Sequence, residues 1–273
     1  MNIIINADDF GISASANKAI AELYKKGVIS SATLLVDLPD SKAAADLAKR
    51  DRIPVGLHFN LTLGSPSTPP GTCFKNRGDF ERQLLKGQIK KKFIQDELAR
   101  QYQKMLDFGL TPTHLDSHQH IHNWPQLFPL FARFARAKNI PLRLVLEKTI
   151  FNKYDPFDPA DAKRLWRKFI SLCFGRWNSL LARLLRVQTN RALTSVFALW
   201  PLPAELTGKH LRLILRQARH NTEYMCHPLA AADNTPTAIT GISAQEYVLM
   251  TNPEFFAMIY NKFNLINFGG LNG

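Results

Sequence analysis

Short apolar runs alternate with helix-like segments through the first third of the chain, and this rhythm constrains the fold more than any other feature. Strands that alternate with helices form a parallel sheet with helices on its faces, so we predict an α/β fold. Strands are expected at residues 3–6, 32–36, 55–63, 113–122, 142–146, 224–227 and 265–268. Helices are expected near residues 13–27, 43–48, 94–108 and 127–137, and a loop rich in Pro, Gly and Ser at 65–78.

Residues 150–222 break this rhythm, and we expect them to form a helical insertion in a single domain of residues 1–273. On a helix with about 100° per residue, the basic residues of segment 164–187 fall on one side and its aromatic and aliphatic residues fall opposite. The basic residues are Arg164, Arg167, Lys168, Arg176, Arg183 and Arg186. Such a helix suits a membrane interface, or it packs on the fold with its basic side in water.

Two adjacent carboxylates, Asp8 and Asp9, directly follow the first expected strand. Ligands of parallel α/β folds bind beyond the carboxyl ends of the strands. Adjacent side chains there point to different sides, so one carboxylate can bind a metal ion while the other accepts a proton from water. Taken alone, the pair is more typical of a turn, because Asp often initiates turns.

Histidines are concentrated in the middle of the chain, where four of the eight lie between residues 114 and 122. In a strand, alternate residues share a face, which would align His114, Asp116, His118, His120 and His122. Such a face is costly to bury without partners, and imidazoles beside carboxylates are typical of metal sites. Residues two apart lie about 6.5–7 Å apart along a strand, so one metal ion cannot bind them all. The spacing does not choose among them, and a solvated edge is the alternative.

Three further residues carry charge or imidazole where apolar side chains are expected. His58 lies within an apolar strand, where a core histidine is more common than a ligand. His227 ends a strand before Pro228, where it could act as a general acid or belong to a loop. Arg143 lies in another apolar strand and is expected to pair with a carboxylate, because an unpaired buried charge costs too much.

Four motifs occur in order along the chain, at residues 6–11, 56–58, 113–122 and 225–228. Together they resemble the YdjC-like carbohydrate deacetylases. The resemblance covers nearly the whole chain and is weakest in the insertion. It implies a distorted, TIM-like (β/α) barrel with one divalent metal ion, and an enzyme that removes an N-acetyl group from an amino sugar, either an oligosaccharide or a lipid-linked glycan.

The resemblance also implies roles for individual residues. Carried over by position, the metal ligands are Asp9, His58 and His118, the general base is Asp8 and the general acid is His227. Only the resemblance selects His118 over His120 and His122. In the mechanism that follows from it, Arg143 would orient Asp8 and keep it ionised. One carboxylate and two imidazoles suit zinc, and magnesium, manganese and nickel are also compatible.

The formal net charge of +13 suits an anionic partner but does not identify it. A metal-dependent phosphoesterase is the main alternative enzyme, although two-metal sites usually need more carboxylates. Nucleic acid is disfavoured, because no basic-aromatic motif accompanies the strand ends. Without a signal peptide or an apolar run of about 18 residues, we expect a cytoplasmic protein, with segment 164–187 as a contact to the inner membrane face. The oligomeric state stays open, a homodimer included.

Overall fold

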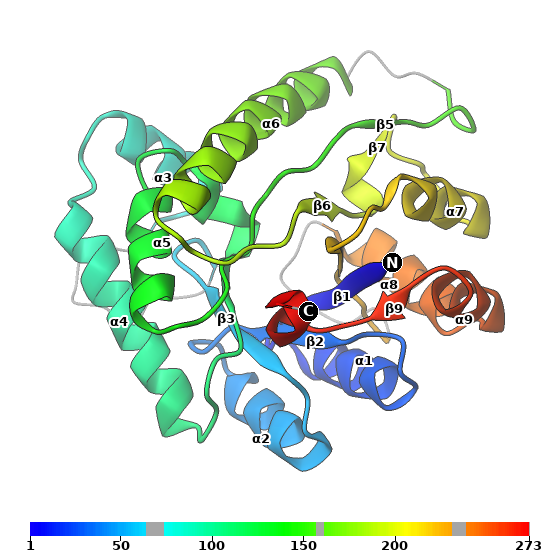
Figure 1. Ribbon diagram of the computed structural model, residues 1–273, viewed down its shortest axis with the longest axis horizontal. Helices are drawn as coiled ribbons and strands as arrows, with labels where there is room; N and C mark the ends of the chain where they lie inside the picture. The colour runs from blue at the N-terminus through cyan, green and yellow to red at the C-terminus, as the bar shows by residue number, and fades with distance from the viewer. Residues whose placement is uncertain (64–73, 157–160, 231–238, 273) are drawn as a thin grey trace.

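A curled sheet of parallel strands forms the centre of the molecule, and helices cover its outer face (Figure 1). The structure is a computed structural model that describes residues 1–63, 74–156, 161–230 and 239–272. The strands of the sheet follow the order β4-β3-β2-β1-β8-β6, with β9 paired to β1. Their bounds are Asn2–Phe10 (β1), Ser31–Leu34 (β2), Val55–Phe59 (β3), Leu115–Ser117 (β4), Ala192–Thr194 (β6), Thr222–Cys226 (β8) and Asn264–Leu265 (β9). The α/β class is as predicted, and the sheet forms a half-barrel.

The four helices expected at 13–27, 43–48, 94–108 and 127–137 form within a few residues of these bounds, and further helices accompany them. The described helices are α1 (Ala14–Lys25), α2 (Ser41–Asp51), α3 (Arg77–Leu85), α4 (Lys91–Asp107), α5 (Phe128–Ala137), α6 (Asp161–Leu184), α7 (Gly208–Gln217), α8 (Thr240–Met250) and α9 (Pro253–Tyr260). Ser13 caps α1 by accepting a hydrogen bond from the amide of Ala16. Gly27 adopts a φ of 71° just beyond its end, a conformation that glycine takes without strain. None of the described helices is both long and apolar enough to span a bilayer.

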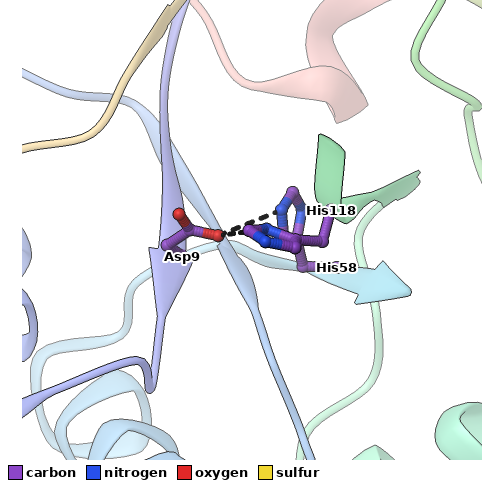
Figure 2. Close-up of side chains that lie close together, drawn as sticks. All are labelled: Asp9, His58 and His118. Carbon is purple, nitrogen blue, oxygen red and sulfur yellow. Dashed lines mark hydrogen bonds and ion pairs between the residues drawn. The ribbon is translucent and has the colours of Figure 1, made fainter. Parts of the chain in front are cut away.

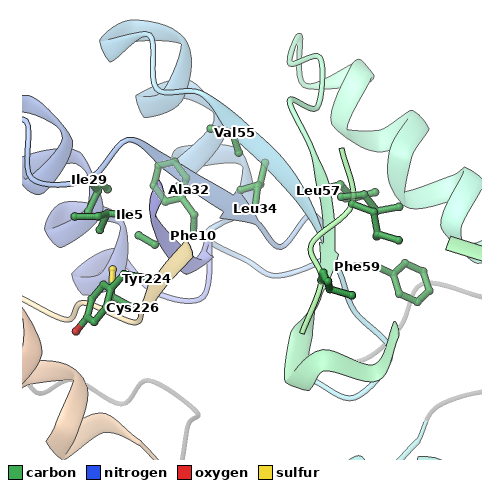
Figure 3. Close-up of a cluster of buried hydrophobic side chains, with 14 of the residues drawn as sticks. Ile5, Phe10, Ile29, Ala32, Leu34, Val55, Leu57, Phe59, Tyr224 and Cys226 are labelled. Atoms are coloured by element: carbon green, nitrogen blue, oxygen red, sulfur yellow. The ribbon is translucent and has the colours of Figure 1, made fainter. Parts of the chain in front are cut away.

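The core explains why β1 lies at the centre of the sheet. Every residue from Ile3 to Phe10 is buried, so both faces of this strand are covered. Figure 3 shows Ile5 and Phe10 among apolar side chains of the neighbouring strands, including Leu34 and Tyr224. A strand buried on both faces is typical of parallel sheets and reads as a continuous apolar run. The polar residues at the end of β1 are therefore exceptions that need partners inside the fold.

The half-barrel is joined at its open side by residues 142–147, where a full strand was expected. This segment makes only two isolated parallel bridges. One joins Leu142 to Leu115 on β4, and the other joins Glu147 to Leu193 on β6. Between these bridges, the backbone N–H of Leu144 donates to the side chain of Asn190. The irregular segment thus lies between the two edge strands and directs Arg143 into the interior.

The prediction of a strand over residues 113–122 is wrong beyond Ser117. β4 spans only Leu115–Ser117, and a 3-10 helix, His118–Asn123, follows at once. Gln119 and His120 have φ values of 53° and 56°, which end the strand alternation. The five polar side chains of this segment therefore do not share one face.

The region expected as a helical insertion holds more than helices. It contains α6 and α7, but also β6 of the main sheet and a small second sheet in which β5 (Ile150–Phe151) pairs with β7 (Leu199–Trp200). The long helix α6 is continuous across Gly175. A Cβ atom at Gly175 would lie 2.2 Å from the carbonyl oxygen of Val145, so glycine there permits close packing. The expected loop at 65–78 lies mostly outside the described residues, and α3 begins within its end.

We expect Gly175→Ala to lower the free energy of unfolding by about 1–3 kcal/mol, because the added methyl overpacks the contact of α6 with Val145. Gly208→Ala is the matched control, since a Cβ there has open space and alanine favours a helix by up to about 1 kcal/mol. Urea denaturation followed by circular dichroism measures both. Equal stability of the two variants would contradict the packing role of Gly175.

Candidate metal centre

Three side chains from different elements converge at the carboxyl edge of the sheet (Figure 2). Asp9 lies at the end of β1, His58 on β3, and His118 on the first residue after β4. The Asp9 Oδ1 atom is 3.3 Å from His58 Nε2 and 2.9 Å from His118 Nδ1. One possible ligand atom from each residue lies within 4.8 Å of the others. The structure therefore brings together the three residues that the sequence analysis assigned as ligands, in a group that could hold a metal ion.

Backbone distortions place these ligands. Asp9 has a φ of 64°, and the register of β1 against β2 shifts between Ala7 and Phe10. This bulge turns the Asp9 carboxylate towards the histidines, whereas the Asp8 carboxylate binds inside the barrel. Left-handed backbone at a non-glycine residue costs roughly 1–3 kcal/mol and persists where the surroundings enforce it, often at functional sites.

A second carboxylate fixes the orientation of His58. Asp116 Oδ1 lies 2.7 Å from His58 Nδ1, which leaves Nε2 directed at Asp9. Burial by itself lowers the pKa of His58, but the charges and hydrogen bonds of Asp116, Asp9 and Asp8 outweigh it and raise the pKa to about 10. A carboxylate behind a histidine is the usual support of a metal-binding imidazole. The same negative charge that stabilises a proton on His58 would attract a cation.

Arg143 connects the carboxylates beneath this group. Its guanidinium is fully buried and binds Asp8 through both Nη atoms, at 2.7 and 2.6 Å. Its Nη1 atom is also 2.6 Å from Asp116 Oδ2, and its Nε atom is 2.9 Å from Glu223 Oε1. The predicted pairing of Arg143 with a carboxylate is thus confirmed, with three carboxylates in place of one.

Asp8 and Glu223 both contact Arg143, but their pKa values shift in opposite directions. Burial raises the pKa of Asp8, but the charge and hydrogen bonds of Arg143 outweigh it and hold this pKa well below its usual range. Burial also raises the pKa of Glu223, and here it exceeds the effect of Arg143, so the pKa reaches about 7. Asp8 is therefore ionised at neutral pH even though it is buried.

His227 lies across the site from the other histidines, just beyond β8. Its backbone N–H donates to Glu246 Oε2 at 2.9 Å, and its buried Nδ1 has no hydrogen-bond partner among the described residues. A cavity of about 20 Å³ is lined by Asp8, Asp9 and His227, together with residues of α1 and α8. This volume is about that of one water molecule. Burial lowers the pKa of His227, whereas the charges of Asp9 and Asp8 raise it, and the net shift is downward.

The remaining histidines of the 114–122 segment lie elsewhere. The His114 ring stacks on Phe268 with ring centroids 3.8 Å apart, as part of the core. His122 lies between Ser117 Oγ and the carbonyl oxygen of Arg143. His120 lines a separate pocket on the inner side of α6. Neither His120 nor His122 belongs to the group formed by Asp9, His58 and His118.

Two buried acids of this region, Glu223 and Glu246, were not predicted from the sequence. Glu223 lies in the apolar strand β8, so the signal that identified Arg143, a charge inside an apolar run, could also have identified Glu223. Glu246 lies on α8 and gives no such signal, because acidic residues are ordinary on helices. Its contacts with Tyr224 and His227 exist only in the folded chain.

The chain is similar to known proteins over most of its length. The family model of YdjC-like protein matches residues 2–261. The carbohydrate deacetylase of Geobacillus stearothermophilus is 41% identical over 145 residues, which are 52% of this chain and 59% of that protein. The chitooligosaccharide deacetylase of Salmonella paratyphi C (strain RKS4594) is 39% identical over 201 residues, which are 71% of this chain and 78% of that protein. The first of these alignments thus spans less than two thirds of its relative.

A solved structure has a similar fold over the full length. It is a protein of Enterococcus faecalis V583 named for cellobiose-phosphate cleavage, with a TM-score of 0.76 and 21% sequence identity. The superposition covers 99% of this chain and 98% of that chain. At this level of identity, the similarity shows a shared fold and no more.

We expect Glu246→Gln to make the free energy of unfolding less dependent on pH. Burial raises the pKa of Glu246 to about 7, from 4.5 in its ordinary state, so the folded chain keeps a proton that the unfolded chain releases. The contribution of protonated Glu246 to the free energy of unfolding is fully present below pH 4.5 and is lost as the pH rises through 7. The loss amounts to at most about 3 kcal/mol. Urea denaturation at pH 5 and pH 8 should show a smaller loss in the variant. An equal loss in both proteins would contradict this assignment.

Proposed function

Because this chain belongs to the YdjC-like protein family, we propose that it is a carbohydrate deacetylase that hydrolyses the N-acetyl amide of an amino sugar. The observation that carries the proposal is the group of Asp9, His58 and His118 beside a water-sized cavity lined by Asp8 and His227. Amide hydrolysis needs an activated water, a stabilised oxyanion and a proton for the leaving nitrogen. The site offers candidate residues for each requirement.

We propose that Asp9, His58 and His118 hold one divalent metal ion. The donor set fits, because the three ligand atoms converge and Asp116 already holds His58 with its Nε2 atom directed inward. A divalent ion bound there would lower the pKa of water and polarise the amide carbonyl. One carboxylate and two imidazoles suit zinc by ligand type, and manganese, nickel and magnesium are also compatible.

In this proposal Asp8 is the general base. It lines the cavity where a water molecule fits, and Arg143 holds both of its oxygens in place. Its lowered pKa keeps it ionised at neutral pH, so the carboxylate is always available to accept a proton from water.

His227 receives that proton and delivers it to the leaving amine. Both residues line one cavity, and the buried Nδ1 of His227 makes no other hydrogen bond within the described structure. Its lowered pKa leaves the imidazole neutral at neutral pH, so it can take up a proton during the reaction. The hydrogen bond from the His227 backbone to Glu246 holds this segment against α8.

The structure favours one metal ion over two, and so a deacetylase over a two-metal phosphoesterase. A second group of possible ligands, Asp8, His58 and Asp116, shares His58 with the first. Both carboxylates of this second group already bind the Arg143 guanidinium. A cation there would lie against a fixed positive charge, which disfavours it by electrostatic repulsion.

We expect His58→Ala and His118→Ala each to lose the bound metal ion, because each removes one of three protein ligands. Metal content per chain, measured by plasma mass spectrometry after dialysis, reports the loss. His120→Ala is the matched control, since this histidine lies in the same segment but outside the ligand group. Full metal content in both ligand variants would exclude this centre.

We expect Asp8→Asn to retain the metal ion and to lose acetate release by roughly 10²–10⁴-fold, as for other general bases. The assay is acetate release from N-acetylated sugars, both oligosaccharides and lipid-linked glycans, with metal content measured in parallel. Near-normal turnover of Asp8→Asn would refute its role as base. If the metal-loaded natural chain hydrolyses phosphoesters and releases no acetate from any of these sugars, the proposed function is wrong.

A further inference from the structure

The outward face of α6 is apolar. Trp166, Phe169, Trp177, Leu180 and Leu184 are 62%, 55%, 55%, 54% and 76% exposed. Their spacings of three, eight, three and four residues place them along one stripe of the helix, because eight residues are close to two further turns. The Trp166 and Phe169 rings stack on each other with centroids 5.7 Å apart, rather than against the body of the protein. We call these five residues the α6 stripe.

The opposite side of the same helix packs against the fold and includes polar side chains, among them Ser171 and Asn178, which contact Asn123. Gly175, Asn178 and Ala182 are buried against the fold. Arg164 and Lys168 also point this way, and both donate to the carbonyl oxygen of Phe197. The sequence left open whether the helix packs with its basic side in water. In the structure Arg164 and Lys168 contact the fold, whereas Arg167, Arg176, Arg183 and Arg186 are exposed. A large exposed apolar patch marks an interaction surface.

The surroundings of the stripe are positively charged. Between Asp161 and Glu205 the sequence has no acidic residue and eight lysines or arginines. Arg176 and Arg183 are exposed on the helix beside the stripe. An adjoining groove of about 890 Å³ is lined by Trp166, Phe169 and Trp200 together with Lys148 and Arg176. Aromatic side chains thus occur beside cations, both along the helix and in the groove.

We propose that the α6 stripe docks on the surface of an anionic lipid bilayer. A helix of 24 residues is about 36 Å long and would lie along the bilayer, with its tryptophans at the level of the headgroups. The flanking arginines would contact lipid phosphates, which is the charge complementarity that a basic helix offers. A second copy of this chain would bring the same arginines and another charge of +13 against them, so the bilayer is the better partner.

The molecule is arranged for such docking. α6 runs along the periphery, on the opposite side of the sheet from α1 and α2 (Figure 1). Phe151 is 68% exposed, and its ring centroid lies 6.2 Å from that of Trp200 at the groove, which extends the apolar surface beyond the helix. This docking surface is independent of the proposed reaction, because it includes no residue assigned to the metal centre.

Vesicle flotation tests the proposal. We expect the full chain to float with vesicles of phosphatidylcholine and phosphatidylglycerol at low salt, and binding to weaken at high salt. Trp166→Ser/Trp177→Ser should weaken binding by roughly tenfold or more, because the apolar anchor is lost. Arg176→Glu/Arg183→Glu should weaken it by at least about fivefold for each charge. Thermal unfolding confirms that the variants are folded.

The control is a matched charge reversal, Lys18→Glu/Lys42→Glu, on exposed residues of α1 and α2. It should leave binding close to that of the natural chain. No flotation at low salt would overturn the proposal. Equal losses in the control and in the α6 variants would also overturn it, because binding would then reflect net charge alone. A dimer in sedimentation that the tryptophan substitutions dissociate, without vesicle binding, would assign the stripe to a second copy instead.

Discussion

The ion pairs of Arg143 are the interaction on which the rest of the site depends. This guanidinium, at the centre of the half-barrel, contacts carboxylates from β1, β4 and β8. Removing one partner of a buried ion pair typically costs about 3–5 kcal/mol, because the other charge is left uncompensated. Here a single cation compensates three carboxylates, so its position determines how the strands that carry them meet.

The same network explains how two adjacent aspartates acquire different properties. Asp8 is directed inward and is held by Arg143, whereas the bulge at Asp9 turns its carboxylate outward to His58 and His118. Asp116 connects the proposed metal ligands with the ion pairs of Arg143, because one of its oxygens lies against His58 and the other against Arg143. A change in the contacts of Arg143 would therefore alter the orientation of His58, a proposed metal ligand, through Asp116.

The long helix α6 is amphipathic, but its apolar stripe faces solvent and not the core of the protein. Of its basic residues, Arg164 and Lys168 contact the protein, whereas Arg176 and Arg183 are exposed beside the stripe. Close packing at Gly175 and the contacts of Arg164 and Lys168 with Phe197 hold the helix in this orientation. The exposed tryptophans of this helix are the basis of the docking proposed above.

The sequence by itself determined the parallel α/β class, because buried strands and helices differ in the period of their apolar residues. It also located Asp8, Asp9 and His227 near strand ends, His58 within an apolar strand, and Arg143 as a charge in need of a partner. Tertiary structure alone decided which histidine meets Asp9, since the chain turns at Gln119 and His120 and the strand spacing no longer applies. It also decided the partners Asp116, Glu223 and Glu246, and the direction of the α6 stripe. These depend on contacts between residues distant in sequence, which local periodicity does not record.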